Sequence, residues 1–178
     1  ARDELLSPEA FAAKYGNSAD PRLRKISDIY KTYAARLFAA GAMDFDDLLY
    51  NTVRLFQEHQ DVLEHYQRQF KYVLIDEYQD TNNLQYMLAS MLAEGWGNIC
   101  VVGDDDQSIY KFRGATIENI LSFEKQYKGC RTIRLEQNYR STGHILSAAN
   151  AVIANNTERK GKTLWTNSGA GDRLTLYT

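Results

Sequence analysis

Apolar residues in the N-terminal part of the chain recur every three or four positions, which is the period of an amphipathic helix. This pattern predicts a short helix over residues 8–15 and a long helix over residues 22–40. A third helix is expected to begin at Asp44, with Asp44 as its N-cap and Asp47 as its return partner. A fourth is expected over residues 61–68. The pattern therefore indicates a helical N-terminal part.

From Lys71 onward, short apolar runs alternate with helical stretches. Residues 72–75 and 99–102 are continuously apolar and stop abruptly, which is typical of strands buried on both faces. Further strands are expected over residues 132–135 and 174–177. The helices expected in this part of the chain cover residues 84–92, 117–127 and 142–155. The alternation predicts an α/β fold in which right-handed crossovers place helices on both faces of a parallel sheet.

The composition is that of a folded protein and excludes several classes. With 44% hydrophobic residues, 25% charged residues and 2 prolines, disorder along the whole chain is not expected. No apolar run reaches the roughly 18–20 residues of a membrane span, and no signal-peptide pattern is present, so we expect no membrane partner and a cytoplasmic location. The net charge of −2 argues against nucleic-acid binding through overall basicity, although a local basic groove stays possible. Cys100 and Cys130 lack metal-ligand spacing and are expected to be buried free thiols.

Acidic residues follow the first two predicted strands. Asp76 and Glu77 follow the first strand, and Asp104 to Asp106 follow the second. Ligands of parallel sheets bind beyond the carboxyl ends of the strands. Adjacent carboxylates at that edge suit nucleotide hydrolysis, because one can hold Mg²⁺ while the next polarises the attacking water. A solvated acidic turn is the alternative, since Asp is common in turns.

Three segments carry a resemblance to a known family. Residues 73–82, VLIDEYQDTN, look like the Walker B segment of superfamily-one helicases in the form typical of the UvrD/PcrA/Rep family. Residues 101–115, VVGDDDQSIYKFRGA, resemble the family's third motif, and residues 135–142, LEQNYRST, resemble its fourth. The DFDDLL segment at residues 44–49 also fits. The resemblance implies a RecA-like P-loop NTPase sheet with flanking helices.

The same resemblance implies a function. The parent protein would be an ATP-dependent DNA helicase that couples ATP hydrolysis to translocation on single-stranded DNA and to duplex unwinding. Its cofactors would be ATP and Mg²⁺, its partners would be single-stranded and duplex DNA, and its setting would be DNA repair or replication.

Roles at the ATP site follow from the resemblance as well. Asp76 would hold Mg²⁺, and Glu77 would act as the general base or orient the attacking water. Gln79 and Gln107 would sense the γ-phosphate, which suits an amide that can switch between donor and acceptor contacts.

The fourth motif would complete this site with two residues. Arg140 would be the arginine finger, presenting a fixed fork of donors to the transferred phosphoryl group. Tyr139 would stack on the adenine. Without the family match, Arg140 would be interpreted as a surface or ion-pair arginine.

Aromatic and basic residues alternate at Tyr110, Lys111, Phe112 and Arg113. Bases of single-stranded DNA stack on exposed rings while neighbouring cations meet phosphates, whereas core packing is the alternative for such rings. The resemblance implies the first interpretation, with Tyr110, Phe112 and Arg113 as DNA-binding residues. Phe112 departs from the family, in which Trp is frequent at this position. Gln107 lies on the same loop, so ATP hydrolysis could move the DNA strand through a small shift of this loop.

The chain contains no GxxxxGK[ST] phosphate loop. Gly161–Lys162–Thr163 lacks the upstream glycine and the preceding strand, so Lys162 is expected to be an ordinary solvated lysine. The isolated chain is therefore expected to bind ATP weakly and to hydrolyse it poorly, and the rest of the helicase chain would be needed to complete the ATP site.

The domain organisation is also an expectation from the resemblance. The chain begins without an initiator Met and would be an internal piece of the parent. Residues 1–40 would end an inserted helical subdomain, residues 41–137 would form the core of the first motor lobe, and residues 138–178 would begin the second. Two alternatives stay open: a catalytically inactive module that binds nucleic acid or a partner, and the motor part of a helicase–nuclease.

Overall fold

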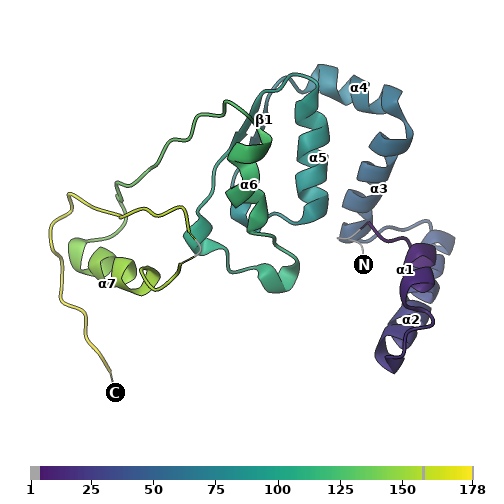
Figure 1. Ribbon diagram of the computed structural model, residues 1–178, viewed down its shortest axis with the longest axis horizontal. Coiled ribbons are helices and arrows are strands. Elements are labelled where there is room, and N and C mark those ends of the chain that lie inside the picture. The colour runs from purple at the N-terminus through teal and green to yellow at the C-terminus, as the bar shows by residue number, and fades with distance from the viewer. Residues whose placement is uncertain (1–4, 158, 178) are drawn as a thin grey trace.

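The structure is a computed structural model that describes residues 5–157 and 159–177. The molecule is elongated, with α1 (Pro8–Tyr15) and α2 (Pro21–Ala39) at one end and α7 (Gly143–Ile153) at the other (Figure 1). In the part of the chain that the structure describes, no helix is both long enough and apolar enough to cross a membrane.

The helices of the N-terminal part form where the periodicity predicts them. α3 (Phe45–Glu58) and α4 (Gln60–Gln69) follow the pair α1 and α2. The Asp44 side chain accepts from the Asp47 N–H at 2.8 Å, and the Asp47 carboxylate accepts from the Asp44 N–H at 3.3 Å. These reciprocal hydrogen bonds confirm the predicted capping box, which fixes the start of α3.

A β–α–β unit forms the centre of the molecule. β1 (Val73–Ile75) and β2 (Ile99–Val101) pair in parallel, with α5 (Asn83–Glu94) between them in the chain. α5 packs against both β1 and α3. The buried core residues at this contact are Tyr50, Val53 and Leu84. The two strands and the connecting helix therefore confirm the predicted α/β class with a small parallel sheet.

α6 (Glu118–Gln126) covers the segment that follows β1. The Tyr78 ring, which is 1% exposed, meets Phe123 of α6 edge to face at a centroid distance of 5.7 Å. Burial, with a smaller contribution from Tyr127, raises the pKa of Tyr78 to about 12. This packing anchors the chain directly after the first pair of acids.

Two of the predicted strands are not formed. Residues 132–135 and 174–177 are irregular in the structure. The nearest pairing is an isolated parallel bridge between Gln137 and Trp165. A strand needs a neighbour for its backbone N–H and C=O groups, and no described residue forms a ladder with either segment.

The prediction that both strands are buried on both faces is also wrong. Leu74 is 74% exposed, and its partner in the register, Cys100, is exposed as well. Successive strand residues face opposite sides, so these two residues lie on one open face of the sheet. Cys100 is therefore not the buried thiol that was expected, and Cys130 is only partly buried.

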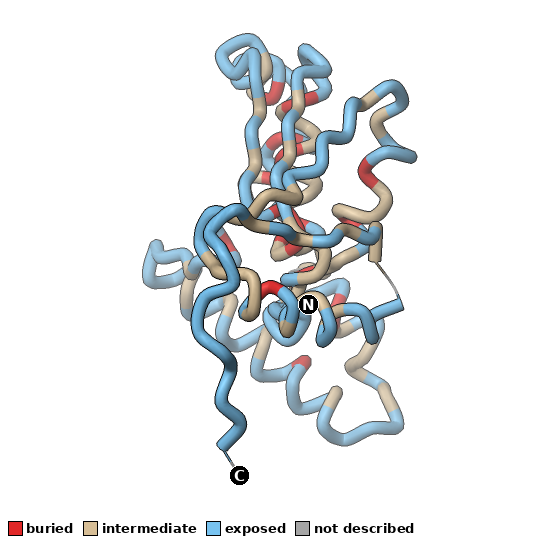
Figure 2. The backbone as a smooth tube through the Cα atoms, turned by 90° about the vertical axis from the view of Figure 1, so that its left-hand side faces the viewer, coloured by how far each residue is buried: buried red, intermediate tan, exposed pale blue. Residues whose placement is uncertain are grey.

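Figure 2 shows the exposed C-terminal segment running away from the body of the molecule.

Candidate functional site

The two acidic segments meet at one edge of the sheet. The two segments stay hydrogen-bonded to each other beyond the ends of the strands. The Val102 N–H donates to the Ile75 carbonyl at 2.8 Å, and the Tyr78 N–H donates to the Val102 carbonyl at 2.9 Å. The residues that follow β1 and β2 are thereby held side by side. This arrangement follows from parallel pairing, which places both carboxyl ends at the same edge.

A buried glutamine joins the two strand ends. The Gln79 side chain is 1% exposed; its Nε2 donates to Glu77 Oε2 at 2.7 Å, and its Oε1 accepts from the Asp104 N–H at 2.9 Å. Gln107 Nε2 in turn donates to Asp104 Oδ2 at 2.7 Å. Glu77, Gln79, Asp104 and Gln107 therefore form one chain of hydrogen bonds, and the residues from the predicted Walker B segment and third motif share one site.

Glu77 occupies an unusual backbone conformation. Its φ of 50° and ψ of 42° lie in the left-handed region, which a residue with a Cβ rarely adopts. Its N–H donates to Asp76 Oδ1 at 2.9 Å, and both side chains are exposed at the sheet edge. Backbone strain of this kind is found at functional sites, where the surrounding structure enforces it. Because the Asp76 carboxylate is exposed, it is available to a hard cation, which prefers oxygen ligands.

Gly103 allows the two strand ends to approach this closely. A Cβ built on it would lie 2.6 Å from Gln79 Oε1 and 2.9 Å from Ile120 Cδ1. Any side chain at this position would push the bridging amide out of place.

We therefore expect Gly103→Ala to destabilise the protein by about 1–3 kcal/mol, which is the usual penalty for overpacking. Urea denaturation of the two proteins measures the difference. The penalty should be smaller in a Gln79→Ala background, because one of the two clashing groups is then absent. An equal penalty in both backgrounds would show that the Gln79 contact is not its cause.

The acids that follow β2 are paired with basic residues from the C-terminal part of the chain. The Arg159 guanidinium meets Asp106 Oδ2 at 2.8 Å, and the Lys162 ammonium contacts Asp104 Oδ1. Burial raises the pKa of Asp104, but hydrogen bonds from Lys162 and Gln107 outweigh this effect, so the pKa lies below its usual value. The prediction that Lys162 is an ordinary solvated lysine is wrong, since its side chain is only 19% exposed.

This pairing bears on which acids could hold a metal. Oxygens of Asp104, Asp105 and Asp106 lie within 4.8 Å of one another, as a cation site would require. Each of these acids, however, already accepts a hydrogen bond from the basic side chains or backbone of residues 159–162. The Asp76 carboxylate accepts the Glu77 N–H, but it is exposed and has no basic partner among the described residues, so it is the better candidate for a metal ligand.

The predicted DNA-binding residues lie on the short 3₁₀ helix η4 (Lys111–Arg113) and, for Tyr110, directly before it. The rings of Tyr110 and Phe112 lie 5.9 Å apart and are 38% and 78% exposed. The Arg113 guanidinium lies 5.2 Å from the Tyr110 centroid and 5.6 Å from the Phe112 centroid. The rings therefore form an exposed aromatic surface with a cation on it, and they are not part of the core.

Hydrogen bonds fasten this loop to the segment after β1. Ser108 Oγ donates to the Gln79 carbonyl at 3.3 Å, and the Thr116 N–H donates to the Thr81 carbonyl at 3.0 Å. Asn119 Nδ2 also donates to the Thr81 carbonyl, at 3.2 Å. Asn119 and Thr81 are buried and were not identified from the sequence, because nothing local marks two polar residues 38 positions apart as partners.

Tyr139 and Arg140 lie on a separate turn. Asn138 Oδ1 accepts from the N–H groups of Arg140 and Ser141 at 2.9 and 2.7 Å, which fixes the backbone. Both side chains are exposed, and the Tyr139 hydroxyl donates to Gln137 Oε1 at 3.0 Å. Among the described residues, no hydrogen bond or ion pair joins either of them to the acids at the strand ends. The structure thus brings together the predicted Walker B segment and the third motif, but not the fourth motif.

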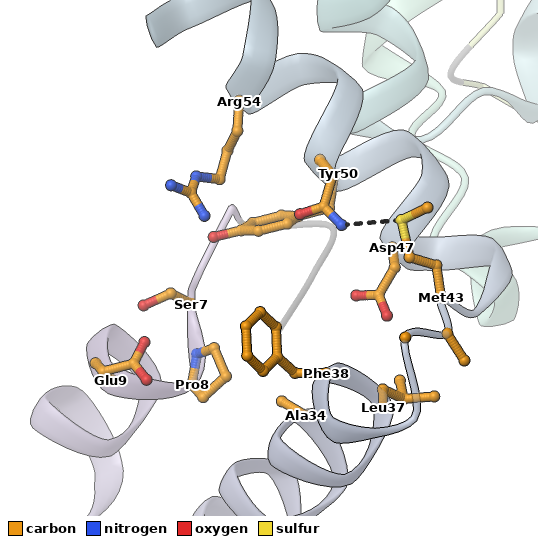
Figure 3. Close-up of a pocket in the computed structure, with 13 residues that line it drawn as sticks. Ser7, Pro8, Glu9, Ala34, Leu37, Phe38, Met43, Asp47, Tyr50 and Arg54 are labelled. Atoms are coloured by element: carbon orange, nitrogen blue, oxygen red, sulfur yellow. Dashed lines mark hydrogen bonds between the residues drawn. The ribbon is translucent and has the colours of Figure 1, made fainter.

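A cavity of about 540 Å³ lies elsewhere, between α1, α2 and α3 (Figure 3). Figure 3 shows Phe38 below the Tyr50 ring, with Arg54 above it. Asn51 Nδ2 donates to Met43 Sδ at 3.4 Å at its edge. The lining includes none of the predicted site residues, so we assign this cavity no part in the site.

Comparison with known proteins agrees with these observations. The chain matches the family model of the UvrD/REP helicase N-terminal domain over residues 1–128 and that of the UvrD-like helicase C-terminal domain over residues 133–178. It is 52% identical over 177 residues to the ATP-dependent DNA helicase PcrA of Bacillus subtilis. It is 49% identical over 183 residues to the ATP-dependent DNA helicase UvrD1 of Mycobacterium tuberculosis. Each alignment covers 99% of this chain and 24% of the relative, so the chain spans about a quarter of the length of these proteins.

Proposed function

Because the chain belongs to the UvrD/REP helicase family, we propose that the intact protein is an ATP-dependent DNA helicase. It would couple ATP hydrolysis to movement along single-stranded DNA and to unwinding of duplex DNA. The observation that carries this proposal is the chain of hydrogen bonds from Glu77 through Gln79 and Asp104 to Gln107. This chain connects the acids after β1 to the loop that bears the exposed aromatic residues.

The proposed fold is a RecA-like motor lobe. A parallel β–α–β unit with acidic residues at the carboxyl ends of both strands supports this assignment. In the proposed organisation, residues 1–40 end an inserted helical subdomain, residues 41–137 form the core of the first lobe, and residues 138–178 begin the second. The cytoplasmic location predicted from the sequence remains a prediction.

Asp76 and Glu77 have different roles in the proposed ATP site. Asp76 would hold Mg²⁺, which when bound would supply charge neutralisation for the triphosphate. Glu77 takes a proton from the attacking water or orients that water. The Gln79 amide positions the Glu77 carboxylate, because its Nε2 donates to Glu77 Oε2 at 2.7 Å. Gln107 would sense the γ-phosphate directly. Gln79, whose buried amide is bonded to Glu77 and to the Asp104 N–H, would sense it through those two residues.

Arg140 and Tyr139 act from the second lobe in this proposal. Arg140 stabilises charge that develops on the transferred phosphoryl group, and Tyr139 stacks on the adenine. Their exposure on a turn held by Asn138 supports this assignment, since neither side chain is committed to the core. Closure of the two lobes around the nucleotide would then complete the site.

The aromatic surface formed by Tyr110 and Phe112, with Arg113, is the proposed contact for single-stranded DNA. Exposed rings accept any base, because every base has a face that can stack. The hydrogen bonds from Ser108 to Gln79 and from Thr116 to Thr81 tie this surface to the ATP site. Loss of the γ-phosphate on hydrolysis can therefore move the bound single-stranded DNA.

The test is titration of the intact protein with labelled single-stranded DNA. Tyr110→Ala combined with Phe112→Ala should weaken binding at least about thirtyfold, because each stacked base contributes about 1–3 kcal/mol. Phe38→Ala combined with Phe45→Ala is the matched control, since these rings are 89% and 88% exposed and lie on other elements. An affinity equal to that of the control pair would remove the aromatic surface from the mechanism.

The catalytically inactive module is not favoured by these findings, since the acids and amides of the two strand ends form one connected site. Catalysis is nevertheless proposed only for the intact protein. The 178-residue chain carries no phosphate-loop motif of its own.

A further inference from the structure

Four residues in the C-terminal part of the chain, Arg159 to Lys162, lie against the acidic turn Asp104–Asp106. We call them the basic segment. In Figure 1 the chain returns from α7 to the centre of the molecule to make this contact. Arg159 and Asp106 are 53 residues apart in the sequence, and their side chains are only 15% and 10% exposed. The contact is thus tertiary and largely shielded from water.

Each acid of the turn contacts the basic segment, and Asp106 contacts both Arg159 and Lys162, the latter at 3.8 Å. Arg159 pairs with Asp106 at 2.8 Å, the Lys160 N–H donates to Asp105 Oδ2 at 2.7 Å, and Lys162 contacts Asp104. Arg159 also donates to the Lys162 carbonyl at 2.8 Å, which holds the two cations in register. Three adjacent carboxylates repel one another, and the basic partners offset this repulsion. Removal of one basic partner would leave a partly buried carboxylate without a compensating charge.

Asp104 connects this contact to the proposed hydrolysis site. Its Oδ1 meets Lys162, its Oδ2 accepts from Gln107 Nε2 at 2.7 Å, and its N–H donates to Gln79 Oε1 at 2.9 Å. The Asp106 N–H also donates to Oδ1, at 3.0 Å, so Lys162 and this backbone hydrogen bond together orient the carboxylate that holds Gln107. No other described residue places a cationic side chain on Asp104.

The Arg159–Asp106 pair is not fully engaged. Within the described residues, Arg159 Nε and Asp106 Oδ1 are buried without a hydrogen-bond partner, while Nη2 and Oδ2 form the observed bond. A small approach of the basic segment would complete the bidentate pair that Arg and Asp favour.

We propose that Lys162 and Arg159 are positioning residues that couple the C-terminal part of the chain to the Gln107 loop. The acidic turn lies within the part matched by the N-terminal family model, and the basic segment lies within the part matched by the C-terminal one. Movement of one part relative to the other would change the hold on Asp104 and hence the orientation of the Gln107 amide. This inference rests on the proposed function and adds to it a route by which lobe movement controls hydrolysis.

The chain offers a matched control for the test. Lys160 carries the same charge in the same segment, but its ammonium pairs with Glu124 at 3.1 Å and not with the acidic turn. In the intact protein, Lys162→Met should lower kcat of DNA-stimulated ATP hydrolysis about tenfold, because small misplacements of a reacting group are costly. The KM for ATP should change by no more than about twofold, as for an interaction needed in the transition state. Lys160→Met should resemble the wild type, and Lys162→Arg should restore most of the lost activity.

An equal loss in Lys160→Met and Lys162→Met would overturn the proposal, as would a loss that appears only in KM. Hydrogen–deuterium exchange tests the contact independently of catalysis. Lys162→Met should raise exchange across residues 103–116, whereas Lys160→Met should not. Unchanged exchange in Lys162→Met contradicts the positioning role even if the protein proves not to be a helicase. A wild type without DNA-stimulated hydrolysis would instead count against the proposed function.

Discussion

Glu77→Gln should lower DNA-stimulated ATP hydrolysis by the intact protein about a thousandfold, within the range known for loss of a general base. The substitution keeps the size of the side chain, and its amide oxygen can still accept the hydrogen bond from Gln79 Nε2. The network at the strand ends should therefore stay in place. Only the ability to take a proton from water is removed, so ATP binding should be nearly unchanged.

Steady-state hydrolysis at saturating ATP and DNA, combined with equilibrium binding of a fluorescent ATP analogue, separates these two effects. Glu94→Gln is the matched control, because Glu94 is an exposed glutamate at the end of α5. It should retain wild-type activity. A Glu77→Gln protein that keeps more than about a tenth of the wild-type rate would contradict the assigned role, since a general base contributes more than that.

Arg140→Ala should reduce the hydrolysis rate at saturating ATP about a thousandfold or more, because an arginine finger typically contributes a factor of this size. Arg140→Lys should restore little of the loss. A lysine keeps the positive charge but lacks the planar fork of donors that matches the phosphoryl oxygens. The contrast between the two variants therefore tests the geometry of the contact and not only its charge.

Single-turnover hydrolysis measured in rapid mixing experiments would report this effect directly. Arg131→Ala serves as the control, since Arg131 is exposed and lies just before the fourth motif. The backbone turn built by Asn138 does not involve the Arg140 side chain, so stability should be unchanged. Near-complete activity of Arg140→Lys would show that a point charge is sufficient, and wild-type activity of Arg140→Ala would remove the residue from the site.

The elements that could be predicted from the sequence are those that local rules determine. Helical periodicity and the Asp44 capping box located the N-terminal helices, because both depend on residues three or four positions apart. The short apolar runs located β1 and β2. The burial of their faces could not be predicted, because it depends on which distant segments cover them, and Leu74 remains 74% exposed.

The strands expected at residues 132–135 and 174–177 illustrate the same limit. Both segments have the composition of strands, but a strand forms only where a neighbour accepts and donates its backbone hydrogen bonds. No described segment takes that place. Strand propensity therefore indicated an extended chain there, and tertiary context determined that no sheet formed.

Part of the candidate site could be predicted from the sequence, and part of it could not. The acids at the strand ends and Gln107 could be placed at one sheet edge, because parallel pairing dictates it. The bridging role of Gln79 could not, since it depends on a contact across 25 residues. The partner of Lys162 lies 58 residues earlier in the chain. The opposite charges of the DDD and RKGK segments were the one available signal for that contact.

The position of the metal in the intact protein tests the proposed ATP site most directly. Crystals grown with Mn²⁺ in place of Mg²⁺, a non-hydrolysable ATP analogue and a short single-stranded oligonucleotide would show the ion by anomalous diffraction. An Mn²⁺ peak is expected beside Asp76, with Gln107 facing the γ-phosphate and a base against Tyr110 or Phe112. A peak within the Asp104–Asp106 turn, or a nucleotide bound away from this sheet edge, would contradict it.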